Sequence, residues 1–128
     1  MQIEIQLTNA PIAEQSPSVP VAGAGAWVEF RGMVRREENG QAIGALEYEA
    51  YSPMAEREMR RIIEETTRRQ PCLFVRVIHR LGVIPVGEAA IYVGIAGKHR
   101  AESFGLLTEF MERLKQGVPI WKRRALSV

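Results

Sequence analysis

The amino-acid sequence predicts an α+β domain in which a mostly antiparallel sheet packs with two long helices. Strand-like runs follow one another without helices between them, and two long segments show the three-to-four-residue spacing of amphipathic helices. Asn39-Gly40 is a strong signal for a tight turn. At 128 residues the chain has the size of one domain. We therefore expect a single domain over 1–128, with 1–24 as an irregular N-terminal strand and connection.

Three strands are expected in the first half of the chain. Residues 2–7 alternate between polar and apolar side chains, as a half-buried strand does. The connection over 9–25 holds three prolines and should be irregular, with a short helical turn around 12–15. Residues 26–35 and 43–51 are strand-like on either side of the Asn-Gly turn, so we expect them to pair as one long hairpin.

The first long helix is expected to begin at Ser52-Pro53. Serine is a good N-cap, and proline is well accommodated at the first helical position. Acids and arginines alternate along one side, which indicates a solvated face rather than a nucleic-acid-binding stripe. Pro71 is expected to end the helix. The predicted buried face consists of Ala55, Met59, Ile62, Ile63 and Thr66.

Two strands, a second helix and a last strand should follow. Residues 72–81 and 89–96 are apolar and β-branched, with a turn at 85–88 between them. A helix is expected up to Gly117, where Gly and then Pro stop it, and 118–126 is expected to form the last strand. Its predicted buried face consists of Ala101, Phe104, Leu107, Met111 and Leu114.

The composition excludes several classes of function. The chain has no aspartate, two histidines and one cysteine, so neither a dedicated metal site nor an internal disulfide is expected. It shows no dinucleotide or phosphate-loop fingerprint, hence no cofactor is expected. No apolar run is long enough to span a membrane, and the start is not a signal peptide. With a net charge of only +2, nucleic-acid binding is a weak alternative.

The single cysteine and one of the two histidines are expected to have structural roles. Cys72, at the start of a buried strand, is expected to be an apolar filler. His79 lies near the end of the same strand, and no nucleophile or carboxylate stands beside it in the sequence. A structural histidine is therefore favoured there over a catalytic one.

Positive charge is concentrated at the end of the chain. Residues 97–124 carry seven Lys or Arg against three Glu, whereas the preceding residues carry ten basic and twelve acidic side chains. This asymmetry predicts an anionic ligand. His99 and Lys115 lie at opposite ends of the second helix, roughly 24 Å apart. One small ligand could meet both only if a second copy of the chain supplied one of them.

Six short motifs stand in order along the chain. They are FRGMVR at 30–35, YEAY at 48–51 leading into Met54, VIHRLG at 77–82, GE at 87–88, KHR at 98–100 and PIWKR at 119–123. From about Gly25 to Arg124 the sequence thereby resembles the large catalytic subunit of molybdopterin synthase. The resemblance implies an α/β-hammerhead fold and a homodimer at the centre of a heterotetramer.

The resemblance also implies an activity and its partners. The family converts cyclic pyranopterin monophosphate to molybdopterin by installing two sulfurs as a dithiolene. The sulfur arrives as a thiocarboxylate on the C-terminal glycine of a small ubiquitin-like subunit. A cytoplasmic sulfurtransferase of molybdenum cofactor biosynthesis is therefore expected, with no nucleic-acid or membrane partner.

Two lysines match the family's catalytic lysines. By this resemblance Lys115 should lie nearest the incoming thiocarboxylate and Lys122 nearest the pterin. Beside other cations in a desolvated site, a lysine can act as base or nucleophile, or it can balance the charge of an acyl intermediate. The alternative for both is an exposed charge at the end of a helix or strand.

Five further residues complete the predicted site. Arg35, His99 and Arg100 match the family's substrate-anchoring residues, the latter two supplied by the neighbouring subunit. Arg35 and Arg100 would hold phosphate through their forked donors. For Arg35 the alternative is a solvated charge at the hairpin. Phe30 and Met111 are candidates for pocket walls, with core packing as the equal alternative.

The sequence departs from the family in three places. It stops four residues after Arg124, where the family usually continues with a tail that adds a basic residue to the pocket. Arg124 itself stands where an acidic residue is usual. The segment before Gly25 is short and proline-rich. The alternative function is therefore a tail-truncated paralogue that binds the ubiquitin-like sulfur carrier without turnover.

Overall fold

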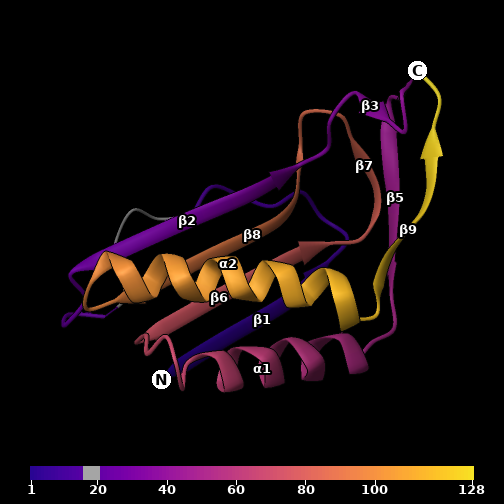
Figure 1. Cartoon of the computed structure of the whole chain (residues 1–128). Coiled ribbons are helices and arrows are strands. Elements are labelled where there is room, and N and C mark those ends of the chain that lie inside the picture. The colour runs from indigo at the N-terminus through magenta and orange to yellow at the C-terminus, as the bar shows by residue number, and fades with distance from the viewer. Residues whose placement is uncertain (16–20) are drawn as a thin grey trace.

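The computed structural model describes residues 1–15 and 21–128 and confirms the α+β class (Figure 1). It contains a four-stranded sheet, a three-stranded sheet, a two-stranded ribbon and two helices. Part of the connection expected to be irregular, 16–20, lies outside the described residues. The helical turn expected at 12–15 is wrong, because these residues form no regular structure. In the described part of the chain, no helix is long and apolar enough to cross a membrane.

The four-stranded sheet has the spatial order β1-β6-β8-β2. Its strands are β1 (Gln2–Thr8), β6 (Phe74–Arg80), β8 (Ala89–Gly97) and β2 (Ala26–Met33). The β1–β6 pair is parallel and the other two pairs are antiparallel. Apolar residues of β6 and β8 on one face, including Val75, Val77, Val93 and Ile95, form the main core with the helices.

The first helix, α1 (Met54–Thr66), matches its sequence pattern closely. All five residues expected on its buried face are buried. Its start differs, however, because Pro53 is the N-cap and the Ser52 hydroxyl donates to the Glu56 carboxylate at 2.8 Å instead of capping the helix. The helix also ends at Thr66, before Pro71, since residues 67–70 leave it as a turn.

The second helix, α2 (Arg100–Gly117), is rotated relative to the prediction. Its buried residues are Ser103, Leu106 and Phe110. The predicted Ala101 and Phe104 face solvent instead, and Phe104 is 54% exposed. The rest of the predicted face, Leu107, Met111 and Leu114, is half-buried against the core.

Small residues explain this rotation. A Cβ built on Gly97 would lie 2.2 Å from the Ser103 Oγ, so the start of α2 meets β8 almost in backbone contact. The Ser103 hydroxyl donates to the His99 carbonyl at 2.8 Å and is thereby satisfied although it is buried. A phenylalanine would not fit this gap, and Phe104 therefore lies on the outer side.

Two phenylalanines on α2 test this orientation. We expect Phe110→Ala to lower the free energy of unfolding by about 3–5 kcal/mol, because it empties a buried ring position. Phe104→Ala should change it by less than about 0.5 kcal/mol, since the ring is exposed. Urea unfolding followed by circular dichroism measures both. If Phe104→Ala cost as much as Phe110→Ala, the described orientation of α2 would be wrong.

The second sheet has the order β7-β5-β9, with β7 (Gly82–Pro85), β5 (Ala45–Ala50) and β9 (Ile120–Leu126). The long hairpin expected between 26–35 and 43–51 is therefore wrong, because β2 pairs with β8 and β5 pairs with β7 and β9. The Asn-Gly turn closes only the short ribbon of β3 (Glu37–Glu38) and β4 (Gln41–Ala42).

Buried side chains of the intervening segment explain why the two arms separate. Val34 and Ile43 pack with Leu46, Ile84 and Ala90 in a second core, which draws the chain from the first sheet into the second. The β7 strand, missed in the sequence, follows β6 directly after Leu81. The second sheet thus stands at one end of the first, where α2 also ends (Figure 1).

Candidate active site

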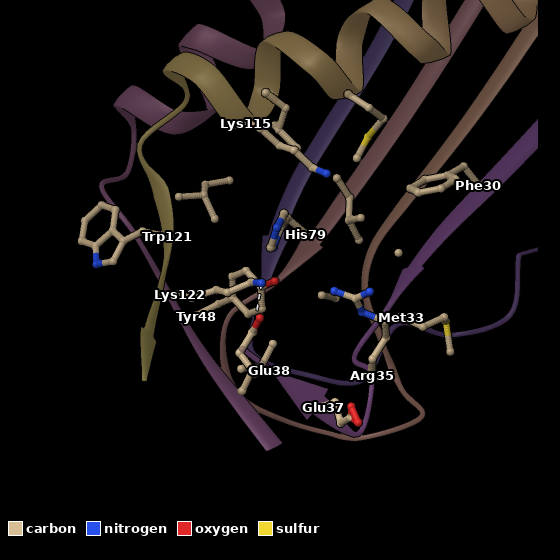
Figure 2. A pocket seen from close by; sticks show the side chains of 17 residues that line it. Phe30, Met33, Arg35, Glu37, Glu38, Tyr48, His79, Lys115, Trp121 and Lys122 are labelled. Atoms are coloured by element: carbon tan, nitrogen blue, oxygen red, sulfur yellow. Dashed lines mark hydrogen bonds and ion pairs between the residues drawn. The ribbon is translucent and has the colours of Figure 1, made fainter. Parts of the chain in front are cut away.

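A cleft of about 480 Å³ lies where the two sheets and the end of α2 meet (Figure 2). Five of the seven site residues predicted from the sequence line it: Phe30, Arg35, Met111, Lys115 and Lys122. These residues come from β2, the segment after it, α2 and β9. The fold therefore gathers side chains from both halves of the chain around one cavity.

The cleft combines cationic groups with apolar walls. Lys115 lies one helical turn after Met111 on α2, and Figure 2 shows its side chain reaching into the space that Arg35 enters from the opposite side. In residues 1–15 and 21–128, neither Lys115 nor Arg35 forms an ion pair, whereas Lys122 does. Phe30 adds an aromatic wall. Cations beside apolar surfaces can bind an anionic ring system.

Lys122 is held by neighbours that the sequence patterns did not single out as site residues. It lies directly opposite Tyr48 in the β5–β9 pair. Its Nζ donates to the Glu38 carboxylate at 3.0 Å. Burial raises the pKa of Tyr48, the charge of Lys122 opposes this rise and Glu38 adds to it. Alternation in β5 could have indicated that Tyr48 points inward, but no local pattern marks Glu38.

His99 and Arg100 do not line this cleft. They begin α2, whereas Lys115 lies near its end, and the helix is 18 residues long. The backbone N–H of His99 donates to the Glu102 carboxylate at 2.6 Å within a capping box, and the His99 side chain is 81% exposed. Within one chain these two residues thus stand apart from the lysines, as their spacing predicts.

His79 forms part of the cleft wall although it was expected to be structural. Its ring is buried beside the ring of Tyr48, with 5.3 Å between the centroids. Its Nδ1 lies 2.8 Å from the Arg80 carbonyl, which can only accept, so the neutral ring carries its proton on Nδ1. Burial lowers the pKa of His79, and the bond to the carbonyl partly opposes that effect.

The lowered pKa of His79 predicts a pH-dependent stability. The unfolded chain takes up a proton near the ordinary histidine pKa, while the folded chain resists protonation until the pH is lower. Stability should therefore fall as the pH drops from about 6.5 towards 5. In His79→Gln this slope should disappear, whereas His99→Gln, which changes an exposed ring, should keep it. Urea unfolding at several pH values would refute the assignment if both variants retained the slope.

The two sheets meet beside the end of α2, and two lysines and an arginine line the cleft between them. The chain is thus an α+β protein with a cleft that carries cationic side chains. The chain belongs to the family described as MoaE protein, whose model matches residues 5–117. This membership also agrees with the hammerhead arrangement expected from the sequence motifs.

Relatives and solved structures support the same assignment. The human molybdopterin synthase catalytic subunit is 41% identical over 99 residues, which are 77% of this chain and 53% of that protein. Molybdopterin synthase catalytic subunit 1 of Mycobacterium tuberculosis is 38% identical over 95% of this chain and 84% of its own length. The crystal structure of molybdopterin synthase from Staphylococcus aureus superimposes with a TM-score of 0.82 at 30% identity, covering 99% of this chain and 90% of that one. The chain thus spans about half the length of its human relative and most of the bacterial ones.

Proposed function

We propose that this chain is the catalytic subunit of a molybdopterin synthase. It would convert cyclic pyranopterin monophosphate to molybdopterin with sulfur from the C-terminal thiocarboxylate of a small ubiquitin-like subunit. The observation that carries the proposal is the cleft, in which Lys115, Lys122 and Arg35 surround one cavity. Two relatives are named molybdopterin synthase catalytic subunits, and the sequence motifs imply the reaction. We further propose that residues 1–128 act as one domain and that the protein works in the cytoplasm.

The cleft suits a phosphorylated ring and an acyl donor together. Arg35 offers a forked pair of donors for the phosphate, and Phe30 and Met111 offer apolar surfaces for the pterin. Lys115, which forms no ion pair in the described residues, would meet the incoming thiocarboxylate. Its amine can attack the acyl carbon, accept a proton or balance the charge on the tetrahedral intermediate as sulfur leaves. Lys122 would face the pterin.

The site is proposed to be completed by a second copy of the chain. His99 and Arg100 lie at the far end of α2 from Lys115, so they cannot reach the same small ligand. In a symmetric dimer the start of one α2 could lie beside the end of the other, because an isologous interface exchanges the same surfaces. Two such subunits, each binding one ubiquitin-like carrier, would form a heterotetramer.

Reconstitution is the direct test of this function. The purified chain would be mixed with a thiocarboxylated ubiquitin-like subunit and cyclic pyranopterin monophosphate, and dithiolene product would be measured. We expect product in proportion to the thiocarboxylate supplied. A carrier with an ordinary C-terminal carboxylate serves as the control and should give none. A stable complex without product under these conditions would instead support the non-catalytic binding paralogue.

A further inference from the structure

An acidic side chain occupies the cationic part of the cleft. Glu38, from the ribbon strand β3, is mostly buried, and its carboxylate accepts from the Nζ of Lys122 at 3.0 Å. Figure 2 shows this pair on the side of the cleft formed by β9 and β5, away from Lys115. A carboxylate in a site for an anion is unfavourable unless it has a specific task, because it repels the ligand.

The geometry shows what Glu38 does to Lys122. Lys122 stands on β9 opposite Tyr48, and the pairing of the two strands shifts between Glu47 and Tyr48. This irregularity decides which side chains of β9 face the cleft. Half of the Lys122 side chain is nevertheless exposed, so β9 alone does not hold its amine in one place. The carboxylate of Glu38 gives that flexible amine a fixed partner at the wall of the cavity.

We propose that Glu38 is a positioning residue, which holds Lys122 before the substrate binds and releases it to the anionic group of the substrate. This inference rests on the proposed function and adds to it the control of one lysine by a carboxylate. The exchange has two effects. Competition by Glu38 weakens the binding of anions, and the fixed position of Lys122 favours productive orientation of whatever binds. Removal of the carboxylate should therefore tighten anion binding and slow turnover.

The variant Glu38→Gln tests this exchange because it keeps the size of the side chain and removes its charge. Titration with inorganic phosphate, followed by NMR of the backbone amides, should show an affinity about fivefold higher than in the unchanged protein. Lys122→Met should abolish this gain, so that Glu38→Gln changes the affinity less than about twofold when combined with it. Such a double-mutant cycle isolates the pair from the general effect of one fewer negative charge.

Glu47 provides a matched control. It lies on β5, is as buried as Glu38 and pairs with Arg124 of β9 at 2.6 Å, but it does not line the cleft. Glu47→Gln removes the same charge and a comparable ion pair to the same strand, β9. It should change phosphate affinity less than about twofold, because its charge lies outside the cavity.

Turnover supplies a second measurement. In reconstituted sulfur transfer, Glu38→Gln should lower both the KM for the pterin and kcat, the latter about tenfold, since binding improves while Lys122 loses its place. A merely structural Glu38 would lower the thermal midpoint and leave phosphate affinity, KM and kcat unchanged, and that result would overturn the inference. An equal gain in affinity without Lys122 would also overturn it. If the unchanged protein formed no product, the proposed function would fail, while the phosphate cycle would still decide the role of Glu38.

Discussion

Lys115→Ala is expected to lower kcat for dithiolene formation at least about 100-fold, while the fold and the binding of the sulfur carrier stay intact. Lys115 is exposed at the end of α2, so its loss removes no core packing. Within the described residues it forms no ion pair, and its ammonium group has no structural partner to lose. Its side chain lines the cleft, where an acyl group from the carrier would be attacked or stabilised.

The adjacent Gln116 gives the control for this experiment. It is also exposed near the end of α2 but does not line the cleft, so Gln116→Ala should keep kcat within about twofold of the unchanged protein. Single-turnover reactions with a thiocarboxylated carrier would separate chemistry from product release. If Lys115→Ala formed product at the unchanged rate, the cleft would not be the site of sulfur transfer. A loss of carrier binding in this variant would instead place Lys115 in the docking surface.

The helices show how far local pattern predicts this fold. In α1 the prediction of the buried positions was correct, because apolar and charged residues lie on separate faces of the helix. In α2 the prediction followed Phe104 and overlooked Phe110, because apolar residues occur on more than one side. Only the close approach of Ser103 to Gly97 decides which side faces the sheet. That contact joins a helix to a strand and cannot be read from spacing within the helix.

The strand pairing was harder to predict for a similar reason. Asn39-Gly40 does form a tight turn, and both residues take positive φ, 52° and 81°. The turn nevertheless closes a two-residue ribbon instead of a long hairpin, since Val34 and Ile43 are buried in the second core. A turn signal specifies a local reversal of the chain, whereas the length of the hairpin depends on what else the flanking residues can pack against.

The residues of the candidate site also differ in how far local sequence predicts them. The lysines, Arg35 and the two wall residues could be predicted, because the resemblance to a known family assigns a role to each of them. Tyr48 and His79 also lie in those motifs, and Glu38 lies in none, but no site role was predicted for these three residues. The two sheets and the β3–β4 ribbon bring them to the same cleft. His79 was expected to be structural, and its buried ring and bond to the Arg80 carbonyl agree with that role. Its place in the cleft wall depends on tertiary structure alone.

If each site is shared between two copies of the chain, as proposed, mixing two inactive variants should restore activity. Arg100→Ala and Lys115→Ala should each be nearly inactive as pure dimers, because every site would lack one of the two groups. In a mixed dimer, one site would combine the intact Lys115 of one copy with the intact Arg100 of the other. The second site would then lack both groups. Random pairing of equal amounts should therefore restore about a quarter of the unchanged activity.

A second mixture provides the control and the refutation. Lys115 and Lys122 line the same cleft of one chain, so no mixed dimer of Lys115→Ala with Lys122→Ala contains an intact site. The two variants would be co-expressed with different affinity tags, and the presence of both tags would verify the mixed dimers. This mixture should stay inactive. If Arg100→Ala and Lys115→Ala gave no recovery in verified mixed dimers, Arg100 would not act in the partner's cleft. If both mixtures recovered equally, the lysines themselves would be shared between copies, because only then could a dimer lacking one lysine on each chain contain a complete site.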